Sequence, residues 1–226
     1  MTMPFYVAPE QVMQDRADYA RKGIARGRSL TALVCAEGIL LCAENTSSTL
    51  RKIAEIYDRI AFGGVGRYNE FDQLRIAGVR AADLKGYTFS REDVDARSLA
   101  NNYAQILGNV FTHEMKPMEV EILVAELGAD PDSDQLFHIL YDGTVVDESE
   151  FTVLGGDTAA IAERLEESYT EAMPVADGLK AAAAALAGPE RELSAQELEV
   201  AVLDRSETGR AFVRWGDDQV AAALAG

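Results

Sequence analysis

The sequence predicts an α+β fold in which two β-sheets pack face to face and helices form both outer layers. Three observations lead to this prediction. Apolar residues make up 48% of the 226 residues, which is enough for a sizeable core. A helical pattern opens the chain before any strand pattern appears. Blocks of strands then alternate with pairs of helices, an order that suits a layered sandwich and fits a βαβ repeat poorly.

The opening helix is predicted at residues 9–27. Met13, Ala17, Ala20 and Ile24 recur at spacings of four, three and four residues, which places them on one face of a 3.6-residue period. The other faces of this segment are charged, and two interpretations of its basic residues are open: a solvated helix face, or a docking surface for an acidic partner or a neighbouring subunit. The basic residues are Arg16, Arg21, Lys22, Arg26 and Arg28.

Two nearly continuous apolar runs follow the helix, at residues 30–36 and 38–44. They predict a hairpin that is buried on both faces, with a tight turn at Glu37 and Gly38. A third strand is predicted at about residues 56–62, where the chain is again apolar.

The two cysteines flank this hairpin turn. With the turn at Glu37 and Gly38, Cys35 would lie opposite Leu40 and Cys42 opposite Leu33, so the two sulfurs would not pair. We therefore expect free, buried thiols, which fit a reducing compartment.

A helix pair is predicted next, at residues 69–85 and from Ser90 to about Met115. Ser90 and Asp93 have the spacing of a capping box, and Pro117 ends the second helix. The residues expected to be buried in these helices are Phe71, Leu74, Gly78, Ala81, Leu99, Tyr103, Ile106 and Val110.

Three further strands are predicted at residues 120–127, 136–141 and 150–154. Asp142 and Gly143 provide a turn signal between the last two.

The last third of the chain is predicted to hold a second helix pair, two strands and a short helix. Asp157 is a suitable N-cap for the first of these helices, whose apolar stripe is Ile161, Leu165 and Tyr169. Pro174 marks the start of the next helix. The remaining features are the helix end at Gly188 and Pro189, strands at residues 198–203 and 211–215, and the C-terminal helix.

The charge balance limits the classes of partner. With 21 basic and 38 acidic residues the formal net charge is −17, which repels nucleic acid and anionic membranes, so neither is expected as a partner. Residues 1–10 lack the pattern of a signal peptide, and no apolar run approaches the ~20 residues of a membrane span. We expect a cytoplasmic protein.

Few residues in the chain suit catalysis or metal binding. His113 and His138 are the only histidines, and both are interpreted as surface or packed side chains. No histidine and cysteine cluster has metal-ligand spacing, so no metal is expected.

A glycine pair, Gly64 and Gly66, lies between a predicted strand and a helix, where a dinucleotide fingerprint would lie. The third glycine of that fingerprint would be at position 69, which is Asn69. We interpret the segment as a tight turn and expect no cofactor. Nucleotide binding is kept as a minor alternative.

Several segments resemble, in order and spacing, the alpha-type subunits of proteasomes. The similarity runs from about residue 7 to residue 215, and the form of the N-terminus resembles the actinobacterial branch. The segments that carry it are Pro9-Glu10 with Tyr19-Ala20-Arg21, Thr31-Ala32-Leu33 with Gly38-Ile39-Leu40-Leu41, Tyr57-Asp58-Arg59-Ile60, Lys116-Pro117, Leu136-Phe137 with Asp142-Gly143, and Val153-Leu154-Gly155-Gly156.

The resemblance implies a four-layer αββα sandwich of the N-terminal-nucleophile hydrolase type, preceded by an extension helix. It divides residues 1–226, as one domain, into a gate segment at 1–8, the helix at 9–27 and the sandwich core at 28–226. The implied gate residues are Met1, Thr2, Met3, Pro4, Phe5, Tyr6, Val7 and Ala8.

The partners implied by the resemblance are six further copies in a seven-membered ring, a proteasome beta subunit, a ring of AAA ATPase activators and unfolded, tagged protein substrates. A lysine of such alpha subunits pairs with the terminal carboxylate of an activator tail, and Lys52 lies in the matching loop. The subunit itself would form and gate the ring without being an enzyme.

The alternative is an active threonine hydrolase of the beta type. It requires a Gly-Thr junction before the first strand, but the chain has Gly27, Arg28 and Ser29 there, and Thr31 is internal. By the resemblance, the active-site lysine of the beta type would fall near Arg59, whose guanidinium does not exchange protons as a lysine does.

Overall fold

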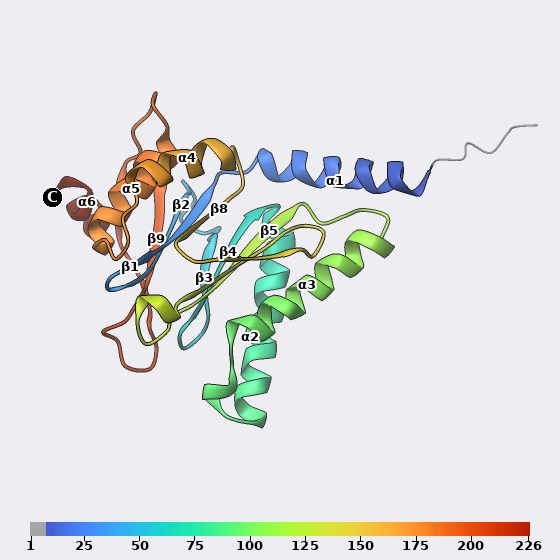
Figure 1. Cartoon of the computed structure of the whole chain (residues 1–226), viewed down its shortest axis with the longest axis horizontal. Coiled ribbons are helices and arrows are strands. Elements are labelled where there is room, and N and C mark those ends of the chain that lie inside the picture. Colours follow the sequence, from blue (N-terminus) through green and yellow to red (C-terminus); the bar gives the residue numbers. More distant parts are fainter. Residues whose placement is uncertain (1–7) are drawn as a thin grey trace, which may run out of the picture.

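The computed structural model describes residues 8–226 and confirms the predicted α+β sandwich. Two five-stranded antiparallel sheets pack face to face, with helices over both outer surfaces. Figure 1 shows these layers, with α1 projecting from one end of the sandwich.

The first sheet has the strand order β10-β9-β2-β1-β8. Its central strands are buried along their whole length, as expected for a sheet covered on both sides. The strands are β1 (Leu30–Cys35), β2 (Gly38–Glu44), β8 (Phe151–Leu154), β9 (Leu198–Asp204) and β10 (Phe212–Arg214).

The second sheet has the order β3-β4-β5-β6-β7 and follows the chain without a crossover. Its strands are β3 (Ile53–Tyr57), β4 (Ile60–Gly66), β5 (Val120–Glu126), β6 (Gln135–Ile139) and β7 (Val145–Glu148).

The helices segregate by sheet. Helices α2 and α3 cover the second sheet, whereas α4 and α5 cover the first and α6 packs on α5. None of the helices between residues 8 and 226 combines the length and apolar character of a membrane span. The helices are α1 (Pro9–Ala25), α2 (Tyr68–Thr88), α3 (Ala96–His113), α4 (Thr158–Ser168), α5 (Val175–Ala187) and α6 (Asp217–Ala225).

Three apolar clusters hold the layers together. One lies between the sheets and includes the fully buried Leu30, Leu41 and Leu123. The second joins the first sheet to α4, α5 and α6, and the third joins the second sheet to α2 and α3. Each sheet therefore buries both faces, which is why its strands read as continuous apolar runs.

The opening helix packs through the predicted face. Ala20 and Ile24 are buried against the inter-sheet cluster, whereas Met13 is 37% exposed. The end of α1 that leads into β1 is therefore fixed to the sandwich, and the beginning of α1 reaches beyond it (Figure 1).

The second sheet differs from the prediction in two places. The strand predicted at residues 56–62 is a hairpin of β3 and β4, with its turn at residues 58–59 and an irregular register between Glu55 and Tyr57. The turn at Asp142 and Gly143 leads to β7, which was not predicted.

The strand after β7 lies in the other sheet. Because β8 pairs with β1, residues 150–154 are not the hairpin partner of β6. The link between β7 and β8 is where the chain changes sheets.

The β1–β2 hairpin is confirmed, but its register was wrong. The turn lies at residues 36–37, so Cys35 is opposite Gly38 and Thr31 is opposite Cys42. Gly38 has φ 152°, a conformation that disfavours other residues. Both thiols are buried and unpaired, as predicted.

The helix predicted from Ser90 begins later. Ser90 caps a short 3₁₀ turn, Arg91–Asp93, and α3 starts after Asp95, whose carboxylate accepts a hydrogen bond from the Ser98 N–H at 2.7 Å. The buried stripes also shift by one residue at two places: Ala82 replaces Ala81, and Leu107 replaces Ile106. Val110 is only half-buried.

Candidate functional site

Lys52 lies where the β2–β3 loop enters β3, next to the start of β1. Its ammonium donates a hydrogen bond to the carbonyl oxygen of Arg28, two residues before β1 begins. The candidate site is therefore at one end of the sandwich, where the chain leaves α1 and enters the first sheet.

A buried carboxylate fixes the backbone of this site. Glu199, in β9, is 2% exposed and accepts hydrogen bonds from the backbone N–H groups of Lys52 at 2.8 Å and Ile53 at 3.2 Å. It also accepts from Asn45 at 2.7 Å and Arg214 at 2.6 Å. Four donors satisfy the buried charge, so the entry to β3 is rigidly placed.

Two arginines form a basic rim around a second carboxylate. Glu44 is 9% exposed and pairs with Arg28 at 3.5 Å and with Arg191 at 3.1 Å. Both guanidinium groups are about half exposed, so they keep hydrogen-bonding capacity toward solvent.

The ammonium of Lys52 is poorly solvated. Burial lowers its pKa from 10.5 to about 8, an effect opposed by the charges of Glu199 and Glu44 and reinforced by Arg28. The group is still mainly protonated at neutral pH. Its hydrogen-bond acceptor is a neutral carbonyl, so an incoming carboxylate would be a stronger partner and would favour the charged form.

The start of β1 lacks an N-terminal nucleophile in residues 28–31. Thr31 is fully buried, and its hydroxyl donates to the Cys42 carbonyl at 3.3 Å. Ser29 is 7% exposed and donates to the Gly155 carbonyl at 3.0 Å. Neither hydroxyl is presented to solvent beside a free amine, because α1 precedes both.

Arg59, near which the lysine of the beta type was expected, forms its hydrogen bonds away from the start of β1. It lies in the β3–β4 turn and donates to the carbonyls of Leu127, at 2.8 Å, and Gly128, at 2.6 Å. Lys52, not Arg59, is the basic residue beside the first strand.

The two histidines both bond to other groups of the chain. His138 bonds to Glu121 at 3.2 Å, and His113 bonds to the Asn109 carbonyl at 3.2 Å. Within residues 8–226 no three histidine, cysteine or acidic side chains are placed to hold a metal ion.

The glycine pair at positions 64 and 66 lies within β4, not in a turn. A side chain at position 64 would overlap Phe71 of α2, so this glycine permits close packing of the helix on the sheet. Close packing of α2 on β4 therefore explains the glycine at position 64.

The basic face of α1 is partly used within the chain. Arg16 donates to the Phe111 carbonyl at 2.6 Å, and Arg21 lies over the Tyr141 ring. Lys22 and Arg26 are exposed. Of the predicted gate residues, Ala8 directly precedes α1 and residues 1–7 lie outside the described part of the chain.

Sequence reasoning missed Glu199 and Arg214. The available signal was a lone acidic residue, Glu199, inside the buried run of β9, since such a charge requires partners.

Comparisons with known proteins agree with this architecture. A sequence profile of the proteasome subunit family matches residues 24–203. The proteasome subunit alpha of Acidimicrobium ferrooxidans is 63% identical over 224 residues, covering 99% of this chain and 97% of its own length. That of Thermobifida fusca is 55% identical over 227 residues, covering 99% and 91%. The chain therefore belongs to the proteasome subunit family and is of its alpha type.

Proposed function

We propose that this chain is the non-catalytic alpha subunit of a proteasome core particle. Seven copies form an outer ring on a ring of beta subunits, control the entry of unfolded, tagged proteins and receive an AAA ATPase activator. The observation that carries this proposal is the Lys52 ammonium, which has a lowered pKa and, within residues 8–226, only the Arg28 carbonyl as hydrogen-bond partner.

Lys52 is proposed to bind the C-terminal carboxylate of an activator tail. Arg28 and Arg191 at the rim would attract the tail, and the short-range ion pair with Lys52 would fix its end. The hydrogen bond that the Lys52 backbone N–H donates to Glu199 supports this role, because a positioned charge loses less conformational entropy on binding than a mobile one.

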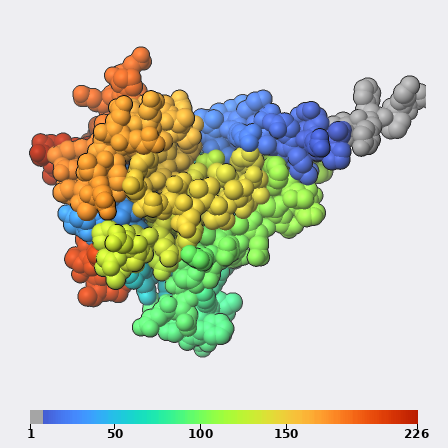
Figure 2. All heavy atoms as spheres, in the orientation of Figure 1, coloured from blue at the N-terminus to red at the C-terminus, as the bar shows by residue number. Residues whose placement is uncertain are grey.

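The gate is proposed to be residues 1–8. Figure 2 shows α1 reaching beyond the body of the molecule, so its beginning can hold the gate segment away from the sandwich core at residues 28–226. The helix at residues 9–27 would then link the gate to the core.

The absence of activity in the isolated chain is also part of the proposal. It is supported by the internal position of Thr31 and by the internal hydrogen bonds of both hydroxyls near the start of β1. The beta-type threonine hydrolase remains the alternative, and it would require removal of about thirty residues. A cytoplasmic location fits the two free thiols.

Assembly is tested by native mass spectrometry and peptide hydrolysis, with the chain alone and with its beta partner. Peptidase activity only in a large mixed particle, with this chain at its unprocessed mass, supports the proposal. Activity of the chain alone, or loss of the segment before β1, would support the hydrolase alternative instead.

Activator binding is tested with peptides that copy the C-terminal segment of the ATPase, as free acids and as amides. The free acid should stimulate hydrolysis by the assembled particle, and Lys52→Ala should abolish this stimulation. Lys180→Ala, a substitution on the surface of α5, is the matched control. Equal stimulation by the amide would refute the carboxylate contact. Deletion of residues 2–8 should raise peptide hydrolysis without any activator.

A further inference from the structure

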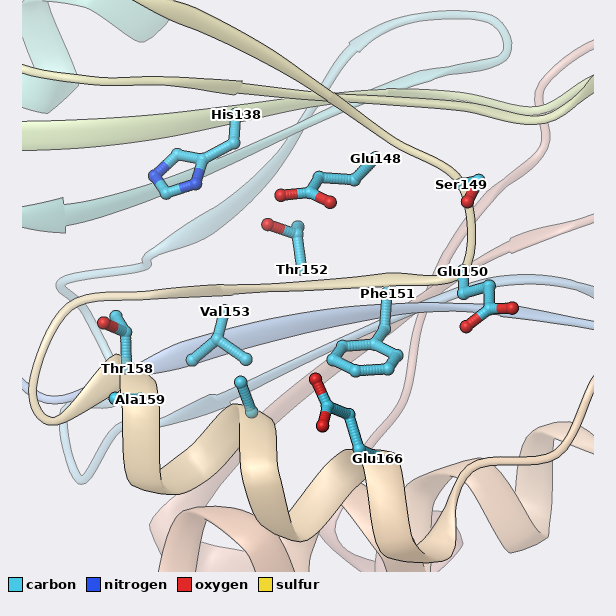
Figure 3. Close-up of a pocket in the computed structure, with 11 residues that line it drawn as sticks. His138, Glu148, Ser149, Glu150, Phe151, Thr152, Val153, Thr158, Ala159 and Glu166 are labelled. Atoms are coloured by element: carbon cyan, nitrogen blue, oxygen red, sulfur yellow. The ribbon is translucent and has the colours of Figure 1, made fainter.

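One side of the sandwich carries a cavity where the chain changes from one sheet to the other. Its volume is about 390 Å³, and it is lined by residues of β6, β7, β8 and α4. Figure 3 shows these residues around the β8 strand, with α4 below it. Figure 2 shows the β7–β8 region and α4 side by side on the face turned to the viewer.

The cavity is acidic. Glu148, Glu150 and Glu166 line it, and within residues 8–226 none of the three carboxylates has an ion pair or a hydrogen-bond donor. Glu150 and Glu166 are exposed, so their carboxylates can pair with a basic group of an incoming molecule.

Two buried polar side chains also face the cavity. Thr152 is 3% exposed, and its hydroxyl has no hydrogen-bond partner in the described part of the chain. His138 is 9% exposed and uses one ring nitrogen for Glu121, which leaves the other without a protein partner in residues 8–226. In Figure 3 both side chains lie on the same side of β8 as Glu148. Both side chains line the cavity wall, where an incoming molecule can reach their free polar atoms.

The backbone of β8 is open at the same place. Among the strands of residues 8–226 it pairs with β1 alone, and the Val34 N–H donates to the Glu150 carbonyl at 2.8 Å. Because pairing in an antiparallel ladder alternates, the N–H and C=O groups of Phe151 and Val153 point away from β1. Exposed strand edges of this kind are normally covered or paired.

A basic residue, Arg51, lies on the opposite side of the sandwich, level with the acidic cavity. In the second sheet, one row of paired residues runs from Val146 through His138, Leu123 and Gly63 to Ile53. Two residues before Ile53 is Arg51, which is exposed and, among residues 8–226, forms no ion pair.

The first sheet gives the same alignment. A row of paired residues runs from Thr152 through Ala32, Leu41 and Ala201 to Arg214. Arg214 in turn donates to the Ile53 carbonyl at 2.6 Å. Both sheets therefore connect the cavity on one side to the neighbourhood of Arg51 on the other.

We propose that Leu50 and Arg51 of one copy bind the acidic cavity of a second copy. Arg51 would pair with Glu150 and Glu166, and Leu50, which is 49% exposed, would contact the apolar wall at Phe151. A head-to-tail contact between opposite edges generates a closed ring when the rotation between copies closes. This inference rests on the proposed ring and names one contact within it.

Cysteine cross-linking tests the contact directly. Arg51→Cys with Glu150→Cys, in the chain assembled with its beta partner, should give a ladder of covalently linked copies on mild oxidation. The native cysteines are buried and do not compete. Arg97→Cys with Glu150→Cys, which places the first thiol on the exposed surface of α3, is the control and should stay uncross-linked.

Charge exchange provides a second measurement. Arg51→Glu, or Glu150→Arg with Glu166→Arg, should lower the fraction of chain in the ring about tenfold, because like charges then meet. Combining the exchanges should restore assembly. All three positions are exposed, so folding is unaffected.

The outcomes separate the contact from the ring itself. If the wild-type chain forms the ring but the Arg51→Cys, Glu150→Cys variant does not cross-link, or if the ring tolerates the charge reversals, this contact is overturned and the ring stands. A wild-type chain that stays monomeric with its beta partner overturns both.

Discussion

The carboxylate of Glu199 accepts a hydrogen bond from the backbone N–H of Lys52 at 2.8 Å, although the two residues are 147 positions apart. This contact joins β9 of the first sheet to the entry of β3 in the second. The residue proposed to bind an activator is thus held by a buried charge that also pairs with Arg214. Stability and site geometry are coupled here.

Replacing Glu199 by Ala should therefore destabilise the whole fold. The change leaves Arg214, two backbone N–H groups and the Asn45 amide without their acceptor. We expect a loss of about 3–5 kcal/mol in the free energy of unfolding, as for a broken buried ion pair. Urea unfolding followed by circular dichroism measures it. Glu163→Ala, on the exposed face of α4, should change stability by less than about 0.5 kcal/mol.

The lowered pKa of Lys52 should appear as a pH dependence of stability. Folding lowers the pKa from 10.5 to about 8, so the unfolded chain binds more protons between these values. Below about pH 8 the full cost of burying the charged ammonium lowers the free energy of unfolding. This cost disappears as the pH rises toward 10.5, above which the amine is neutral in both states. Relative to Lys52→Met, the wild-type chain should gain stability across this window. A difference that is constant from pH 7 to pH 11 would show that the pKa is not shifted.

The two cysteines should be inert in the folded chain. Burial raises the pKa of both thiols from 9.0 to about 12, so the reactive thiolate is scarce as well as inaccessible. At pH 8 a thiol reagent should label neither residue in the native protein and both after unfolding in urea. Glu163→Cys supplies an exposed thiol as the positive control. Rapid labelling of Cys35 or Cys42 without unfolding would show that the hairpin opens.

Apolar pattern and turn residues predicted most of the layers. The buried positions Ala20 and Ile24 follow from the helical period, and the β1–β2 hairpin follows from its two apolar runs. The β3–β4 hairpin was missed because its turn at Asp58 and Arg59 contains neither glycine nor proline.

The candidate site was less predictable than the fold. Lys52 was named through the resemblance, since nothing in the loop itself distinguishes it from a solvated lysine. Its lowered pKa depends on burial, which outweighs the opposing charges of Glu199 and Glu44, and its acceptor Arg28 is 24 residues away. Such contacts between distant segments arise from tertiary packing, so the local pattern of apolar residues does not predict them.

Substitution of Gly78 in α2 should destabilise the protein, because a new side chain there would overlap one atom of α3. The Tyr103 hydroxyl is buried without a hydrogen-bond partner in residues 8–226, and it lies where a Cβ on residue 78 would be. Glycine to alanine inside a helix normally stabilises by about 0.5–1 kcal/mol. Here the overlap should reverse the sign and cost roughly 1–3 kcal/mol.

Tyr103→Phe is the diagnostic partner of Gly78→Ala. Removing the unpaired hydroxyl should raise the free energy of unfolding by about 1 kcal/mol, because a buried polar atom without a partner is lost. In the double variant the nearest overlapping atom is absent, so part of the cost of Gly78→Ala should disappear. Gly216→Ala, with no atom of residues 8–226 within 4 Å of the new carbon, is the control. If the free-energy changes of the two single variants simply add in the double variant, then α2 and α3 separate to accept the methyl group. The tyrosine hydroxyl would then not set their spacing.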